Sequence, residues 1–151
     1  MSIHHLLRCC LLLALVAAVP GKAGETSPGT VHVELTGLHH ASGNIYIAVY
    51  DSGDTWLGKD AVLQQKVVIA EALQGEIVHA ELRLQPGEYA FSIFYDSNNN
   101  GKLDTNFIGI PREPVALSNN AQARFGPPKY KDAVFPLGTE PVIQRIAIDT
   151  M

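Results

Sequence analysis

Residues 89–104 read YAFSIFYDSNNNGKLD and join a strand pattern to a loop of polar residues. The run Tyr89–Tyr95 is rich in aromatic and β-branched residues, which favour β-strands. Short oxygen-bearing side chains then recur at Asp96, Asn98, Asn100 and Asp104. This spacing lets a tight loop direct several oxygens toward one hard cation, and Gly101 permits the sharp bend. The stretch therefore predicts a strand that leads directly into a cation-binding loop.

The loop shares much of its ligand spacing with an EF-hand calcium loop. The candidate ligands, in order, are Asp96, Asn98, Asn100, the backbone carbonyl of Lys102, and Asp104. Phe107 stands where an EF-hand has its bidentate glutamate, and no amphipathic helix follows, so a helix–loop–helix EF-hand is excluded. Glu113 is the nearest acid that could supply the missing carboxylate.

Two carboxylates within the loop predict weak calcium binding, with a Kd on the order of 10⁻⁴–10⁻³ M. The alternative to a calcium site is a plain polar turn. Asn and Asp side chains commonly bond to their own backbone in such turns, and Asn-Gly favours a positive φ. The sequence leaves both interpretations open.

The amino-terminal residues 1–23 have the pattern of an export signal. Arg8 precedes the apolar run Cys9–Val19, and small residues at Gly21 and Ala23 suit cleavage. The apolar run is shorter than the roughly 20 residues that span a bilayer. We therefore expect an exported protein, periplasmic or secreted, with no membrane span.

Removal of the signal changes the composition of the chain. Both cysteines lie within it, so the remainder has no thiol chemistry and no disulfide. The basic residues fall from 11 to 9 against 15 acidic residues, which gives a formal charge of −6. This balance argues against nucleic acid and anionic membranes as partners. We expect a flexible lead over residues 24–29 and one β-sandwich domain over residues 30–151.

Short strands with turn signals between them dominate the rest of the chain. The expected strands are Thr30–Gly37, Ile45–Tyr50, Leu63–Ala70, Ile77–Leu84, Glu88–Tyr95, Asp132–Pro136 and Pro141–Asp149. A short helix is the alternative at the third of these. Residues Thr105–Lys131 show no regular spacing of apolar residues. The pattern predicts an all-β fold, an antiparallel seven-stranded β-sandwich with one long irregular loop.

Several stretches together carry a resemblance to a known family. They are LQPGEYA at 84–90, YDSNNNGKLDTNFIGIP at 95–111, SNNA at 118–121, RFGPP at 124–128 and DAVF at 132–135. As a set they resemble the bacterial domain-of-unknown-function family 2141, small exported proteins with a prealbumin-like or immunoglobulin-like sandwich. Ala116-Leu117 departs from the Gly-Phe that the family tends to have there. The resemblance implies the fold and export, and it implies no activity.

Other residues suggest weaker sites. Trp56 could form an aromatic platform for a sugar ring, or it could close one end of the sandwich. Three polar residues of the long loop, Asn119, Asn120 and Arg124, are candidates for a partner surface. The histidines lack the spacing of a zinc site, and no hydrolase motif is present.

These observations predict a non-enzymatic binding or interaction module. Its expected partner is an unidentified protein or glycan, and Ca²⁺ is the one cofactor that the sequence suggests. A carbohydrate-binding or adhesin-like domain and a small hydrolase are the alternatives.

Overall fold

Strand β1 (Gly29–Thr36) shows how the sequence pattern becomes structure. In the computed structural model, which describes residues 26–38, 42–122 and 126–148, its side chains alternate between buried and more exposed. Val31, Val33 and Leu35 face the core and are almost fully buried. Apolar side chains at every second position place one face of a strand against a core, as the alternation predicted.

The described residues form nine strands and three single-turn helices. In chain order, the remaining elements are β2 (Asn44–Tyr50), β3 (Leu63–Val68), α1 (Ile69–Ala72), β4 (Leu73–Gln74), β5 (Ile77–Leu84), β6 (Gly87–Asp96), β7 (Val115–Leu117), the 3₁₀ turn η1 (Ser118–Asn120), α2 (Tyr130–Ala133), β8 (Phe135–Leu137) and β9 (Val142–Ala147). None of the helices in the described part of the chain is long and apolar enough to cross a membrane.

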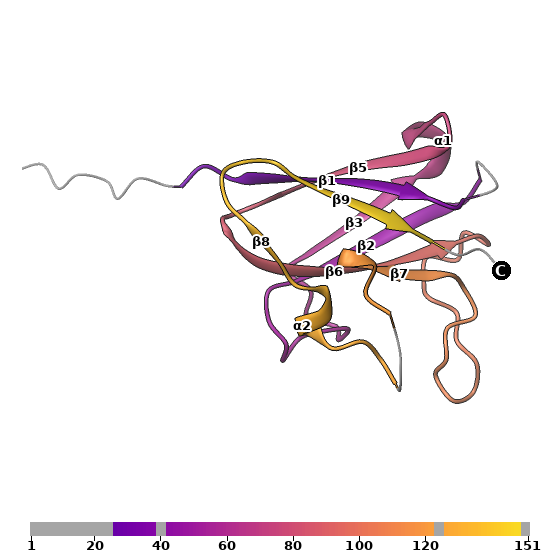
Figure 1. The fold of residues 1–151 in the computed structure, drawn as a ribbon. Coiled ribbons are helices and arrows are strands. Elements are labelled where there is room, and N and C mark those ends of the chain that lie inside the picture. The colour runs from indigo at the N-terminus through magenta and orange to yellow at the C-terminus, as the bar shows by residue number, and fades with distance from the viewer. Residues whose placement is uncertain (1–25, 39–41, 123–125, 149–151) are drawn as a thin grey trace, which may run out of the picture.

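The strands form two sheets that lie one over the other (Figure 1). One sheet has the order β4-β5-β1-β9, and the other has the order β3-β2-β6-β7, with β8 also paired to β6. Between them lies a core of buried side chains: Val31, Val33, Leu35, Ile45, Ile47, Val49, Val67, Ile69, Val78, Leu82, Leu84, Phe91, Ile93, Tyr95, Ala116, Phe135, Leu137, Ile146 and Ile148. The predicted β-sandwich is confirmed.

Two details differ from the sequence prediction. Nine strands replace seven, because β4 and β7 have two and three residues, too few to show a period in the sequence. The sheet that contains β1 is mixed rather than wholly antiparallel, because β9 pairs with β1 in parallel. An alternating pattern identifies a strand and its buried face, but it carries no information about the direction of the neighbouring strand.

Two expected strands also change at their ends. The third stops at Val68, and the short helix α1 begins at Ile69. Residues 63–70 are therefore a strand over most of their length and helical at their end. The strand expected at Asp132–Pro136 is wrong in its first half, which belongs to α2. Only Phe135 and Leu137 are buried in β8, with Pro136 exposed between them. Because β8 pairs with β6 alone, the missing N–H of Pro136 is tolerated.

Strand β6 determines where the polar loop lies. It pairs with β2 in a register that sets Asn44 opposite Asp96, and with β7 in a register that sets Phe94 opposite Val115. Residues 97–114 are thus one excursion between two adjacent antiparallel strands (Figure 1). Because both of its ends lie at the same sheet margin, Glu113 is brought back to the loop that begins at Asp96.

Candidate cation-binding loop

The loop begins at a buried carboxylate. Asp96 is 0% exposed, and its two oxygens accept hydrogen bonds from the backbone N–H groups of Asn100 (3.1 Å) and Gly101 (2.9 Å). Asn99 and Gly101 adopt positive φ angles of 60° and 77°, which bend the chain back over Asp96. The side chain of Asn44, on β2, donates to Asn99 Oδ1 and attaches this bend to the sheet.

Three further side chains of the loop converge on one point. Asn98 Nδ2 and Asn100 Nδ2 both donate to Asp104 Oδ2, at 2.7 and 2.9 Å. Asn98 Oδ1 accepts from the backbone N–H of Asn100, and Asn100 Oδ1 accepts from that of Lys102. Asn98, Asn100 and Asp104 are therefore brought together through the amide nitrogens, while the bonds to the backbone are those of a polar turn.

Glu113 completes this arrangement from the far end of the excursion. It is 8% exposed, and its Oε2 accepts a hydrogen bond from the backbone N–H of Asp104 at 3.0 Å. Its other oxygen, Oε1, is buried and has no hydrogen-bond partner. A buried carboxylate oxygen without a partner is costly, because burial removes its water and nothing replaces it. This oxygen is suited to a ligand that carries positive charge.

The kind of metal is restricted by the available donors. No group of three or more His, Cys, Asp or Glu side chains that could hold a metal occurs in the part of the chain that the structure describes. A cation here would depend on amide and backbone oxygens in addition to carboxylates. Hard oxygen donors suit Ca²⁺, whereas Zn²⁺ prefers nitrogen and sulfur ligands.

Trp56 lies half-buried in an aromatic cluster at a different part of the sandwich. Its ring makes edge contacts with Tyr50 and Tyr130, with ring centroids 5.3 and 5.8 Å apart. Its Nε1 donates to the carbonyl of Pro128 at 2.8 Å. Both the ring and the polar atom of Trp56 are thus engaged within the chain, which is how a residue that closes one end of a sandwich behaves.

Tyr130 has an altered acidity in the same cluster. Burial raises the pKa of its hydroxyl above the ordinary value, and the negative charges of Asp51 and Glu88, together with Tyr89, raise it further. The hydroxyl donates to the carbonyl of Glu88 at 3.3 Å. These effects all favour the neutral, protonated tyrosine.

Asn119 and Asn120 bond to neighbouring segments of the chain. Asn119 exchanges two hydrogen bonds with the side chain of Gln144 and also donates to the carbonyls of Ala133 and Val134. Asn120 donates to the carbonyl of Arg145 and accepts from the N–H of Ala147, both on β9. These side chains fasten η1 to β9 and to the α2–β8 segment.

Some predicted features lie outside the described residues. They are Arg124 and the export signal at residues 1–23. Two residues with no predicted role of their own, Ser118 and Asn106, make several hydrogen bonds in the structure. Ser118 is fully buried and joins the backbone of Phe91 to that of Ala133. The side chain of Asn106 accepts hydrogen bonds from the N–H groups of Ile108 and Ile110 in the turn that follows the loop. In the sequence, only Gly109 indicates this turn.

The chain is therefore a two-sheet β-sandwich in which an Asp- and Asn-rich loop joins two adjacent strands of one sheet. A family model described as an uncharacterized protein conserved in bacteria (DUF2141) matches residues 33–144. The protein belongs to this family, as the resemblance implied. No curated protein and no solved structure matches the chain.

Proposed function

We propose that this protein is an exported, non-enzymatic β-sandwich binding module whose polar loop holds a calcium ion. The observation that carries the proposal is the buried Glu113, which has one oxygen on the Asp104 N–H and one oxygen without a partner. Calcium would replace the missing partner and offset the cost of the buried charge.

The proposed ligands are those predicted from the sequence. Asp104 and Glu113 would contribute carboxylate oxygens, with the carbonyl of Lys102 and one carboxylate oxygen of Asp96. Asn98 and Asn100 now direct their amide nitrogens toward Asp104. Rotation of each amide by about 180° would direct its oxygen there instead. The two amides would thus exchange hydrogen bonds to Asp104 for bonds to the ion.

In this proposal calcium has a structural role, because it holds one segment of the chain in place. Asp104 is joined to the segment beyond it by two bonds, one from its N–H to Glu113 and one to its carbonyl from the N–H of Arg112. An ion held by Asp104 and Glu113 would therefore fix residues 105–112, which lie between them. These residues would then form the binding surface of the module.

Glycan binding by Trp56 has less support, because its ring and its Nε1 contact other parts of the chain. A hydrolase has no specific support in the described geometry. Export remains an expectation drawn from residues 1–23, and fractionation of cells that express the full chain tests it.

Isothermal titration calorimetry of residues 24–151 with CaCl₂ tests the cation site. The described strands begin at Gly29, so this chain retains the whole sandwich. We expect one site with a Kd of about 0.1–1 mM. Glu113→Gln keeps an acceptor for the Asp104 N–H but removes the charge. Asp104→Asn keeps an acceptor for the amides of Asn98 and Asn100 and likewise removes a charge. Both should abolish the heat.

Asp60→Asn is the matched control, because Asp60 is an exposed acid in the loop between β2 and β3. It should bind calcium as the unmodified chain does. Equal binding by Glu113→Gln and the unmodified chain would refute the site, and so would the absence of heat at about 10 mM calcium.

A further inference from the structure

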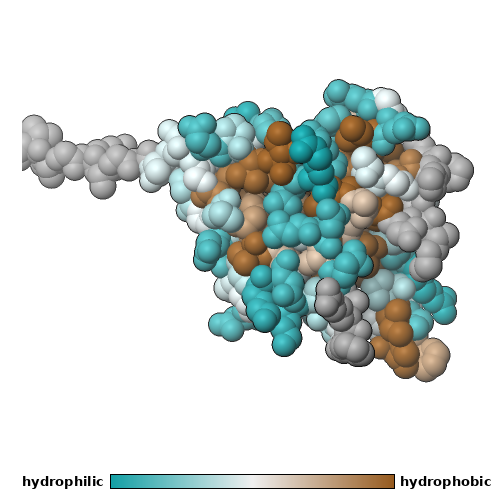
Figure 2. All heavy atoms as spheres, in the orientation of Figure 1, coloured by the Kyte–Doolittle hydropathy of each residue, from teal (hydrophilic) through white to brown (hydrophobic). Residues whose placement is uncertain are grey.

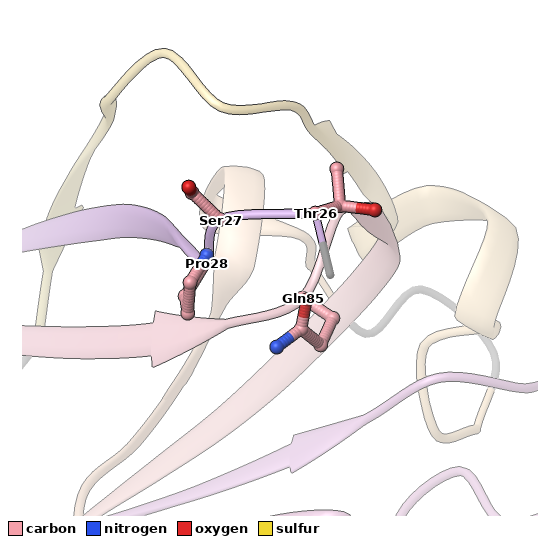
Figure 3. Close-up of a pocket in the computed structure, with 4 residues that line it drawn as sticks. All are labelled: Thr26, Ser27, Pro28 and Gln85. Atoms are coloured by element: carbon pink, nitrogen blue, oxygen red, sulfur yellow. The ribbon is translucent and has the colours of Figure 1, made fainter. Parts of the chain in front are cut away.

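One asparagine of the polar loop is followed directly by glycine. Asn100-Gly101 is the single Asn-Gly pair in the sequence, and every other asparagine precedes a residue with a side chain. Because glycine has no Cβ, its backbone nitrogen can approach the side chain of the residue before it. The pocket near the amino-terminal lead holds no charged side chain and offers no such reaction; it is lined by Thr26, Ser27, Pro28 and Gln85 (Figure 3). The Asn100-Gly101 pair therefore has a chemistry that no other asparagine of the sequence shares.

This pair lies on the surface of the excursion between β6 and β7. Both residues are exposed. The excursion projects at the lower right of Figure 1, and the space-filling view shows hydrophilic residues there beside an apolar tip (Figure 2). A Cβ built on Gly101 would have only the hydroxyl oxygen of Tyr46 within 4 Å, at 3.5 Å, apart from its chain neighbours. Water can therefore reach the pair.

The hydrogen bonds at this pair determine how readily it can react. Asn100 Nδ2 donates to Asp104 Oδ2 at 2.9 Å, and Asn100 Oδ1 accepts from the N–H of Lys102 at 2.9 Å. Both bonds are exposed. The N–H of Gly101 donates to Asp96 Oδ2 at 2.9 Å. Exposed hydrogen bonds of surface loops open locally at a small cost in free energy. The intact turn thus restrains the pair, and local opening of the turn releases it.

We propose that Asn100 is a site of spontaneous deamidation, which converts it to an aspartyl or isoaspartyl residue. When the loop opens and the Gly101 N–H loses its proton to hydroxide, this nitrogen attacks Cγ of Asn100. The N–Cγ bond forms, the Cγ–Nδ2 bond breaks, and ammonia leaves with a proton taken from water. Water then opens the resulting succinimide ring at either of its carbonyl groups. The net reaction consumes a water molecule and releases ammonia, with no oxidation or reduction.

The aspartyl product changes the charge of the loop. It adds a third carboxylate to those of Asp96 and Asp104, and it removes the amide that donates to Asp104. The effect on calcium rests on the proposed function. Since ligand charge is one determinant of affinity in calcium loops, this product should bind calcium more tightly. Without calcium, the carboxylate at position 100 repels that of Asp104.

The isoaspartyl product changes the backbone of the loop. It places an additional methylene group in the main chain between positions 100 and 101. In the unmodified loop, Asp96 accepts from the N–H groups at these two positions, at 3.1 and 2.9 Å. The added atom separates the two donors, so a single carboxylate no longer reaches both in the present geometry. This product should lose calcium binding.

Calcium should slow the reaction if the proposed ligand set is correct. In that set, oxygens of Asp96 and Asn100 bind the ion, which keeps Cγ of Asn100 away from the nitrogen of Gly101. Only calcium-free molecules then react. With a Kd of about 1 mM, about 10 mM calcium leaves about one molecule in ten calcium-free, so conversion should slow about tenfold. Modified chains therefore accumulate where calcium is scarce.

Peptide mapping by mass spectrometry tests the proposal on residues 24–151 incubated with a calcium chelator at mildly alkaline pH. Replacement of NH₂ by OH changes the mass, and fragmentation of the peptide locates the change. We expect Asn100 to convert first. Asn98 and Asn99 are internal controls, because each precedes asparagine in the same loop. They should still be unmodified when half of Asn100 has reacted.

A synthetic peptide of residues 96–104 is the unstructured control, and it should convert faster than the folded chain. The proposal would be overturned if Asn100 of the folded chain stayed unmodified after the peptide had converted. Equal conversion at Asn98 and Asn99 would also overturn it, since the glycine would then have no effect.

Incubation with and without calcium separates this proposal from the cation site. If Asn100 converts at one rate in both conditions and calorimetry detects no calcium binding, only the cation site fails. If calcium binds and Asn100 stays unmodified without it, only the deamidation proposal fails. Asn100→Asp carries the side chain of the aspartyl product and should bind calcium with a Kd lower by about tenfold. An unchanged or higher Kd would overturn the inferred effect of this product on calcium.

Discussion

Glu113 Oε2 accepts a hydrogen bond from the backbone N–H of Asp104 at 3.0 Å, while Glu113 Oε1 is buried without a partner. This pair closes the second half of the excursion between β6 and β7, residues 105–112. The bond joins Asp104, at the end of the polar loop, to Glu113, two residues before the return strand β7. In the carboxylate of Glu113, one oxygen thus holds the loop together and the other is free to accept a further bond.

The first prediction concerns thermal stability. Calcium at about 10 mM, with a Kd of about 1 mM, should stabilise the protein by about 1.4 kcal/mol and raise its Tm by a few degrees. Glu113→Gln should show no such rise. Without calcium it should be as stable as the unmodified chain or more stable, because the buried charge is gone. Thermal melts of both proteins with and without calcium measure these Tm values. A calcium-induced rise in Tm of Glu113→Gln equal to that of the unmodified chain would contradict the prediction.

The second prediction concerns the buried hydroxyl of Ser118. It accepts from the N–H of Phe91 at 3.0 Å and donates to the carbonyl of Ala133 at 2.7 Å. Ser118→Ala leaves two buried backbone groups without this partner, so unfolding should become easier by about 1–3 kcal/mol. Urea denaturation measures this. Ser97→Ala, at an exposed position, serves as the control and should stay within about 0.5 kcal/mol of the unmodified chain.

The third prediction concerns Asn120, which has a φ of 49°. Asn120→Gly keeps that backbone conformation available and removes the side-chain bonds to Arg145 and Ala147. Stability should fall by about 1 kcal/mol, and the amide of Ala147 should exchange with solvent faster. Hydrogen exchange followed by NMR measures this amide. Unchanged exchange at Ala147 would show that the side chain of Asn120 does not protect β9.

The fourth prediction concerns alkaline pH. Because the pKa of Tyr130 is raised in the folded state, the native protein holds this proton more tightly than the unfolded chain does. The resulting stability is present below the unfolded pKa of about 10 and is lost as the pH rises through the folded pKa. Tyr130→Phe lacks this titration.

The measurement is urea unfolding of both proteins between about pH 8 and pH 11. The stability of the unmodified chain relative to Tyr130→Phe should decrease above about pH 10. Other groups titrate equally in both proteins, so only the difference between them is informative. A constant difference across this range would contradict the assignment.

The sequence predicted the sandwich from local patterns that the structure retains. Alternation at Val31, Val33 and Leu35 identified a strand and its buried face, because burial against one layer selects every second side chain. It could not show that β9 runs parallel to β1, nor that the three residues of β7 pair with β6. These features depend on contacts between distant segments.

The same distinction applies to the candidate site. The spacing of Asp96, Asn98 and Asp104 was visible because those residues are close in sequence. Glu113 was only the nearest acid until the register of β6 and β7 brought it to Asp104. The exposure of Phe107 was not predicted, since an apolar residue in an irregular segment gives no period from which burial can be inferred.

The most direct test of the calcium-pinned loop is a ¹H–¹⁵N NMR titration of residues 24–151 with CaCl₂. We expect the amides of Gly101, Asp104 and Arg112 to shift together and saturate in the range of about 0.1–1 mM, with slower exchange of the Arg112 amide. Amides that stay unmoved at about 10 mM calcium, or shifts confined to exposed acids elsewhere, would contradict it.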